Sequence, residues 1–299
     1  MSNQTSELIN AINAKRSRRS ALRTLGMGAV GIGAFGLLES RMDAAPGHDQ
    51  TDAAILNFAL NLEYLEAQYY TYATTGGSIQ NQGIGISGVG TQGTVTIKSS
   101  PMVPFVTSAI QQYANEVAAD EQAHVKFLRA ALGSSAVAMP NIDLQTSFNT
   151  AAQAAGLGST FDPFSSETNF LIGAYIFEDV GVTAYHGAAA LIANKAYLTA
   201  AAGIMGTEAY HAGLVRTILY QLGSDTQAAT TAISTLRATL SGADDDQGVV
   251  VSGNANIVPT DANSLVFART TRQVLNIVYG GVKASSGLFF PNGMNGTIH

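Results

Sequence analysis

Glu121-Gln122-Ala123-His124 and Glu208-Ala209-Tyr210-His211 are two copies of one short pattern, Glu-x-x-His. At this spacing the two side chains lie on one face of a helix, so a single turn can present an oxygen and a nitrogen to the same ion. One such pattern alone is usually a solvated helix face. The chain has only five histidines, however, and chance rarely places two of them three residues after a glutamate. The pair therefore predicts a metal site between two helices.

Two further apolar segments add carboxylates to these motifs. Residues 51–73 have helical apolar spacing without Gly or Pro and contain Glu63 and Glu66, and a later segment carries Glu178 next to Ile176-Phe177. An isolated carboxylate buried in such segments is costly, and cations shared between the helices remove that cost. A lone Glu from each of two helices and Glu-x-x-His from the other two is the ligand pattern of ferritin-like di-metal bundles.

The predicted metal ligands come from all four helices. Glu63 takes precedence over Glu66, which is a substitute or an extra ligand. Glu116 and Asp120 are expected at the surface or behind the ligands, and His186 is equally consistent with a place behind the ligands or with plain packing. Tyr70, Tyr113, Tyr185 and Tyr210 are expected to line the core. The full predicted ligand set is Glu63, Glu66, Glu121, His124, Glu178, Glu208 and His211.

The spacing of these residues sets the expected fold. Glu178 and Glu208 are thirty residues apart, as in an antiparallel hairpin, and Glu121 and Glu178 are fifty-seven apart, which allows a long crossover. We predict an all-α, ferritin-like four-helix bundle over residues 50–223, with a C-terminal extension over 224–299 that packs on it. The four helices are expected at 51–73, from Ser100-Pro101 to Leu132, from Asp162-Pro163 to about Asn194, and from there to Leu222.

The connections differ from those of a compact bundle. Residues 74–100 are rich in Gly, Ser and Thr and are expected to form a long loop, with a hairpin near residues 93–97. In the extension we expect helices at 225–241 and near 264–279, and a β-like segment at 249–251. Asp244-Asp245-Asp246 is expected to be an exposed turn, with a calcium loop as the alternative.

The N-terminal segment has the layout of an export signal. A basic cluster at 15–23 precedes an apolar, Gly-rich run that is too short for a membrane span. The Arg18-Arg19 pair, Leu22 and Arg23 resemble a twin-arginine signal, although Ala21 stands where that signal prefers Phe. We predict that residues 1–45 are an export signal and that the protein is periplasmic or extracellular. A basic amphipathic segment or a membrane anchor is the alternative.

Composition excludes several classes of function. The chain has 299 residues, a net charge of −6 and no cysteine, so disulfides, thiolate metal sites and catalytic thiols are excluded. Six of the fifteen basic residues precede Pro46, which leaves nine basic and eighteen acidic residues in the body. No basic stripe remains for nucleic acid. We expect no nucleic-acid partner and no stable membrane insertion after signal removal, while a homo-oligomer stays open.

Beyond the motifs, longer stretches resemble the ferritin-like domain proteins related to plant desiccation proteins. The matching stretches are residues 56–67, 177–185, 274–279 and 289–293, and the resemblance covers most of residues 50–295. It implies a ferritin-like fold in an exported bacterial protein, and it does not settle the reaction.

Two functions are compatible with these features. The first is a di-metal oxidoreductase with two Fe or Mn ions as cofactors, which oxidises ferrous iron with oxygen or peroxide, or consumes peroxide as manganese catalases do, in stress protection. The second is a non-enzymatic desiccation, stress or surface-assembly protein that keeps the bundle. The complete ligand set favours the first, because a purely structural role does not require it. Mineral storage in a closed cage is a weaker third hypothesis, because the insertion and the extension obstruct such a cage.

Overall fold

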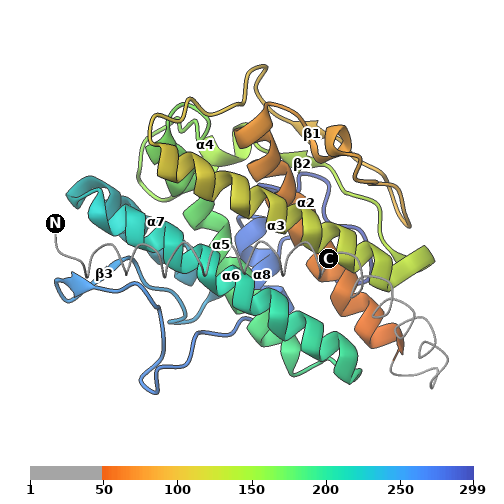
Figure 1. Cartoon of the computed structure of the whole chain (residues 1–299). Helices are drawn as coiled ribbons and strands as arrows, with labels where there is room; N and C mark the ends of the chain where they lie inside the picture. The colour runs from red at the N-terminus through yellow and green to blue at the C-terminus, as the bar shows by residue number, and fades with distance from the viewer. Residues whose placement is uncertain (1–48) are drawn as a thin grey trace, which may run out of the picture. The chain divides into compact units, whose positions relative to one another are not determined.

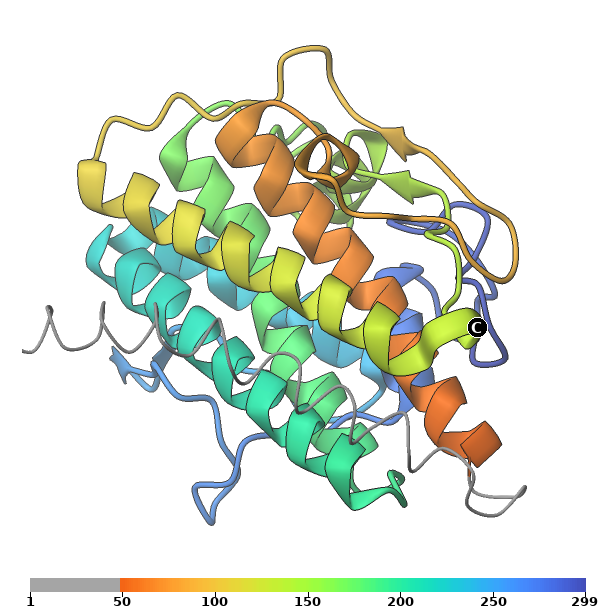
Figure 2. The same cartoon turned by 45° about the vertical axis from the view of Figure 1, so that its right-hand side comes forward.

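Four long helices form the body of the protein in a computed structural model that describes residues 49–299. They are α2 (Asp49–Thr75), α3 (Ser108–Leu132), α5 (Glu167–Ala189) and α6 (Lys195–Gln221). α2 packs along α3 and α5 packs along α6, and α2 also contacts α5 (Figure 1). Figure 2 shows the orange and yellow pair, α2 and α3, beside the green and teal pair, α5 and α6. The predicted all-α, ferritin-like four-helix bundle is confirmed.

Helix α2 lies in the centre of the fold because it is apolar on nearly every side. Leu60, Tyr64 and Ala67 share one face of the helix and Tyr69 lies on the opposite face, yet all four are 0% exposed. A helix that is hydrophobic all round is stable only when other elements cover it. Here α3 and α5 cover part of it, and the connection after α2 and the C-terminal tail cover the rest: Asn295, near the C-terminus, accepts a hydrogen bond from Asn61 at 2.9 Å.

Helix α3 begins eight residues later than Ser100, where the sequence predicted its start. Pro104 disfavours helical backbone at Val103, whose N–H instead donates to the Ala73 carbonyl at 2.8 Å. The first turn of α3 is then capped from another helix, because Glu167 accepts the N–H of Thr107 at 2.9 Å. The predicted cap at Ser100-Pro101 was wrong, since a distant carboxylate supplies it.

The turn between α5 and α6 also differs from prediction. Helix α5 starts at Glu167 rather than near Asp162-Pro163, with the Ser166 hydroxyl accepting the N–H of Asn169 as the N-cap. It ends at Ala189, five residues before Asn194. The Asn194 side chain instead caps α6 by accepting the N–H groups of Ala196 and Tyr197. An Asn at such a boundary fits an N-cap better than a helix interior.

The long connections contain only short elements. The chain between α2 and α3 holds the 3-10 turn η1 (Ile79–Gln82) and strand β1 (Val95–Thr96). The crossover from α3 to α5 holds η2 (Gly133–Ser135), β2 (Ile142–Asp143) and α4 (Thr146–Ala154). β1 pairs in parallel with β2, so the hairpin expected near residues 93–97 was wrong. The segment between α2 and α3 therefore pairs with the crossover and not with itself.

The C-terminal residues contribute α7 (Ser224–Ser241), α8 (Thr271–Val278) and the antiparallel pair β3 (Val250–Val251) and β4 (Asn254–Ala255). Helices α7 and α8 both contact α5. Among the described residues, no helix is both long and apolar enough to cross a membrane.

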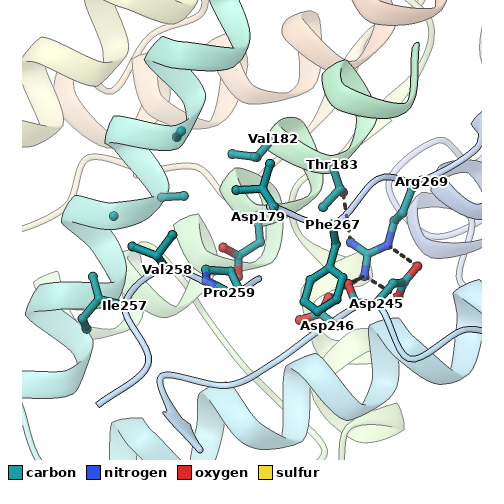
Figure 3. A pocket seen from close by; sticks show the side chains of 14 residues that line it. Asp179, Val182, Thr183, Asp245, Asp246, Ile257, Val258, Pro259, Phe267 and Arg269 are labelled. Carbon is teal, nitrogen blue, oxygen red and sulfur yellow. Dashed lines mark hydrogen bonds and ion pairs between the residues drawn. The ribbon is translucent and has the colours of Figure 1, made fainter. Parts of the chain in front are cut away.

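Buried ion pairs hold the C-terminal residues together and, through Arg237 and Asp179, join them to α5. Arg269 lies 2.8 Å from Asp245 and 2.7 Å from Asp246, and Figure 3 shows it beside a pocket of about 60 Å³ on the outer side of α5 and α6. Arg216 and Arg237 both pair with Asp179 on α5, at 2.8 and 2.9 Å. The expected exposed turn at Asp244-Asp245-Asp246 was therefore wrong for its last two residues, whose side chains are buried against arginines.

Candidate metal centre

The seven predicted ligands meet inside the four-helix bundle. α2 contributes two glutamates, α5 contributes one, and α3 and α6 each contribute one Glu-x-x-His motif. None of the seven is more than 8% exposed. Three overlapping groups have ligand atoms within 4.8 Å of one another, and each group could hold an ion. They are Glu63, Glu121, His124 and Glu208; then Glu121, Glu178 and His211; and finally Glu66, Glu178 and Glu208.

Glu121 lies between the two histidines and faces both of them. Its Oε2 is 3.4 Å from Nδ1 of His124, and its Oε1 is 3.0 Å from Nδ1 of His211. The Glu-x-x-His spacing explains the first contact, since both residues lie one turn apart on α3. The second contact crosses from α3 to α6. One carboxylate thus offers one oxygen to each side of the cluster.

The remaining carboxylates divide the cluster into two halves. In the His124 half, defined by Glu63 and His124, Glu63 Oε2 is 3.2 Å from Nδ1 of His124. In the His211 half, defined by Glu178 and His211, Glu178 Oε2 is 3.5 Å from Nδ1 of His211. Glu208 reaches both, because its Oε1 is 3.4 Å from His124 Nδ1 and it also groups with Glu178.

The side chains of the cluster leave several of their own polar atoms without hydrogen-bond partners, as a cation-binding site does. Buried polar atoms normally have hydrogen-bond partners. Six of the seven buried side-chain atoms without one in the described residues belong to this cluster. They are Glu66 Oε2, Glu121 Oε1, Glu178 Oε2, both carboxylate oxygens of Glu208 and His211 Nδ1. Where His211 donates through Nε2 to Asp120, its Nδ1 and Glu121 Oε1 face each other as two lone pairs at 3.0 Å, and a bound cation satisfies such an arrangement.

The pKa values of the carboxylates in the cation-free cluster also indicate a shortage of positive charge. Burial raises the pKa of Glu63 to about 7, against the attraction of His124. Burial and the neighbouring carboxylates raise the pKa values of Glu66 and Glu208 well above their ordinary range. For Glu121 burial acts in the same direction, but contacts with His124 and His211 outweigh it and lower the pKa to about 2. Protons and cations therefore compete for one set of oxygens.

Two buried tyrosines donate hydrogen bonds to the carboxylates. The Tyr70 hydroxyl of α2 donates to Glu178 Oε1 on α5, and the Tyr185 hydroxyl of α5 donates to Glu63 Oε1 on α2. Burial raises the pKa of both phenols well above the ordinary value, so they stay protonated donors. Tyr113 and Tyr210, also expected in the core, are 40% and 83% exposed, and that expectation was wrong.

The residues expected around the ligands fall in different places. Asp120 Oδ2 accepts a hydrogen bond from His211 Nε2 at 3.3 Å, and its side chain is 43% exposed, so it connects the cluster with the surface. Glu116 is exposed. His186 Nδ1 lies 3.2 Å from the Phe267 carbonyl, so it packs against the C-terminal residues instead of the cluster. The role of Asp120 was readable in part, because it directly precedes Glu121.

Two known proteins are similar to this chain over most of its length. The family model "Ferritin-like domain" matches residues 51–221, the span from α2 to the end of α6. The desiccation-related protein PCC13-62 of Craterostigma plantagineum is 26% identical over 269 residues, which cover 83% of this chain and 84% of that protein. The ferritin-like catalase Nec2 of Nesocodon mauritianus is 24% identical over 274 residues, which cover 84% and 86%.

No solved structure matches the chain significantly. The family match confirms the resemblance to ferritin-like desiccation-related proteins that the sequence indicated. It covers more than half of the chain and spans the four helices that carry the buried carboxylates and histidines. The chain therefore belongs to the ferritin-like domain family.

Proposed function

We propose that this protein is a di-metal oxidoreductase that holds two Fe or Mn ions and consumes hydrogen peroxide in stress protection. The observation that carries the proposal is the position of Glu121, with one carboxylate oxygen toward each histidine. A carboxylate placed in this way suits two neighbouring ions. Carboxylate-rich sites with two imidazoles suit Fe and Mn, both of which change oxidation state readily.

The distances support a specific division of roles. His124 and His211 would each hold one ion through Nδ1, the nitrogen that faces the carboxylates. Glu121 and Glu208 reach both halves and would be the carboxylates available to both ions. The two terminal ligands are Glu63 and Glu178. Glu66 is the extra ligand, within reach of Glu178 and Glu208.

Burial and similarity favour peroxide as the substrate. The cluster lies inside the bundle, with no ligand more than 8% exposed, so only small molecules can reach it. One of the two relatives is named a ferritin-like catalase. In disproportionation, one peroxide is oxidised to oxygen and gives up two electrons and two protons, and a second is reduced by these to two waters. The bound ions supply the redox change between the two half-reactions.

The chain's own residues handle the protons of this reaction. His211 Nε2 donates a hydrogen bond to Asp120, whose partly exposed carboxylate meets solvent. This contact holds the imidazole in the tautomer that leaves Nδ1 free for an ion. The two phenols that donate to Glu63 and Glu178 stay protonated, and their hydrogen bonds stabilise the negative charge of these buried carboxylates.

Elemental analysis and an oxygen electrode test the proposal together. Protein purified from its own host is expected to hold about two Fe or Mn ions per chain, in line with the ligand count of such bundles. It should release one oxygen for every two peroxides consumed. Oxygen uptake on adding ferrous iron, without release from peroxide, would identify ferrous oxidation instead. A single Zn²⁺ and no redox response would support the non-enzymatic stress or assembly protein.

We also propose export by the twin-arginine route, which rests on the sequence of residues 1–45 alone, outside the described part of the chain. That route carries folded proteins, so the ions could be loaded before export. Replacing Arg18 and Arg19 by lysine should retain the protein in the cytoplasm. Unchanged export of this double variant in cell fractions would contradict the proposal.

A further inference from the structure

Helices α2 and α5 carry the same pair of residues at the same spacing. Glu63 is followed seven residues later by Tyr70, and Glu178 is followed seven residues later by Tyr185. Seven residues are close to two helical turns, so each tyrosine lies on nearly the same helix face as its own glutamate. Each then contacts the glutamate of the opposite helix: Tyr70 donates to Glu178 and Tyr185 donates to Glu63. The pairing is reciprocal between antiparallel helices.

The two hydrogen bonds also engage equivalent oxygens. Each phenol donates to Oε1 of its glutamate. In each glutamate the other oxygen, Oε2, faces the histidine of that half, at 3.2 Å for Glu63 and 3.5 Å for Glu178. One oxygen of each carboxylate is therefore occupied by a phenol, and the other is directed to the place where an ion would sit.

Glu66 provides a contrast within the same cluster. It is buried, 6% exposed, and its Oε2 has no hydrogen-bond partner. No tyrosine is recorded as donating to it in the described residues. The phenols therefore donate to two particular carboxylates of the cluster and leave Glu66 without such a hydrogen bond.

We propose that Tyr70 and Tyr185 are positioning residues that keep Glu178 and Glu63 as terminal, one-oxygen ligands, each for one ion. A carboxylate with both oxygens free can bind one ion through both or swing between two ions. The phenol prevents both outcomes, because its hydrogen bond holds Oε1 away from the ion. Each half then keeps a coordination position open for a small substrate. This inference rests on the proposed two-ion site and goes beyond it by assigning one tyrosine to each half.

Replacing each tyrosine by phenylalanine removes the hydroxyl and keeps the ring. Both rings pack in the core, since Tyr70 is 1% and Tyr185 is 6% exposed, so the fold should survive. Tyr64→Phe is the matched control: Tyr64 is 0% exposed, and its hydroxyl donates to the Val137 carbonyl and accepts from Arg129, away from the cluster. It reports what the loss of any buried hydroxyl does.

The experiment titrates metal-free full-length protein with Mn²⁺ and counts free Mn²⁺ by electron paramagnetic resonance. Wild type and Tyr64→Phe should bind two ions. Tyr70→Phe and Tyr185→Phe should each bind one ion as before and the other roughly 10–100-fold more weakly, the usual effect of losing a partner of a metal ligand. The double variant should weaken both ions. Co²⁺ absorption in the visible range should show a changed coordination in each single variant.

The outcomes separate this inference from the proposed function. Two ions with unchanged affinity and unchanged Co²⁺ spectra in both variants would overturn the role of the tyrosines and leave the function standing. Wild type that binds two ions but does not consume peroxide would overturn the function only. Equal weakening of both ions by either single variant would overturn the assignment of one tyrosine to each half, and so would equal weakening by Tyr64→Phe. Wild type that binds no Mn²⁺ would overturn both.

Discussion

The two halves of the cluster have the same central residues but differ in the carboxylates next to them. Each has a glutamate, a histidine and a tyrosine from the opposite helix that donates to the glutamate. The His211 half has two additional carboxylates. Asp120 bonds the outer nitrogen of His211, and Glu66 lies within reach of Glu178. In the described residues no carboxylate is recorded at the outer nitrogen of His124.

The equivalent positions in the sequence explain this difference. Asp120 precedes Glu121 on α3, whereas Thr207 precedes Glu208 on α6, and its hydroxyl donates to the Gly203 carbonyl. Three residues after Glu63 stands Glu66, whereas three residues after Glu178 stands Gly181. The two halves are therefore equivalent at Glu63 and Glu178 and at the two Glu-x-x-His motifs, and they differ at the neighbouring positions. We therefore expect the His211 half to bind its ion more tightly, because more negative charge and a fixed imidazole face it.

The largest effect is expected where the halves meet. Glu121→Ala removes the one carboxylate that faces both histidines, so metal content should fall from about two ions per chain to below one, with loss of peroxide consumption. The fold should persist, because the remaining carboxylates can take up protons. Elemental analysis and circular dichroism measure the two effects. Glu116→Ala is the control, since it lies on the same helix and is exposed. Metal loss in the control alone would contradict the ligand assignment.

The second prediction concerns the metal-free protein and pH. The pKa of Glu63 is raised to about 7 in the folded state from an ordinary 4.5. The folded protein therefore keeps a proton that the unfolded chain loses, and this stabilisation is complete below pH 4.5 and disappears as the pH rises to 7. At about 1.4 kcal/mol per pKa unit, Glu63 alone accounts for a loss of about 3.5 kcal/mol, and Glu66 and Glu208, whose pKa values are also raised, add to it. Glu121 acts oppositely, but only between pH 2 and 4.5.

Thermal unfolding of chelator-treated protein between pH 4.5 and 7.5 measures this loss. Both histidines have raised pKa values because of the carboxylates facing them, and their contribution also falls at rising pH, above about 6.5. Glu63→Gln should reduce the loss between pH 4.5 and 7 without abolishing it, because Glu66 and Glu208 also have raised pKa values. Metal-loaded protein should not show the loss, because ions replace the protons. A metal-free profile that rises toward neutral pH would show that the cluster is charged differently.

Much of this site was predictable because helical spacing determines which side chains share a face. The two Glu-x-x-His motifs and the lone glutamates needed only correct helices, not correct helix ends. The ends were the weaker part: Thr107 is capped by Glu167 from another helix, a contact that local sequence does not contain. The same holds for Asp245, whose partner Arg269 follows twenty-four residues later, so its burial was not predicted.

The four tyrosines expected in the core show that residue type alone is a poor guide to burial. Only Tyr70 and Tyr185 are buried, and those two lie seven residues after Glu63 and Glu178. Tyr210 instead directly precedes His211, and neighbouring residues on a helix point in directions about 100° apart. Since His211 faces the interior, Tyr210 faces out. Among these four tyrosines, the two that lie seven residues after a predicted glutamate ligand are the ones that face the cluster.

The third prediction tests the glycine that stands where α2 has Glu66. A β-carbon on Gly181 would lie 2.5 Å from Glu208 Oε2 and 3.6 Å from Glu66 Oε1. Gly181→Ala should therefore displace Glu208 and destabilise the protein by about 1–3 kcal/mol, as overpacking does. Gly213→Ala on α6 meets nothing within 4 Å and should stabilise the helix by about 0.5–1 kcal/mol. Denaturant unfolding compares the two, and equal effects would mean that Glu208 is not tightly placed.

The smallest effect is expected at Asp120, whose side chain is 43% exposed, so solvent weakens its influence. Asp120→Asn should lower the affinity of one ion about tenfold, the lower end for a partner of a metal-bound histidine, and leave the other unchanged.

Thr207→Asp tests the comparison from the other side. By the equivalence of the two motifs, it should place a carboxylate near His124 and tighten the weaker ion. Stepwise removal by a chelator reads both variants: wild type should release one ion before the other, Asp120→Asn should bring the two steps together, and so should Thr207→Asp. Two ions that leave wild type in a single step would show that the extra carboxylates do not distinguish the halves.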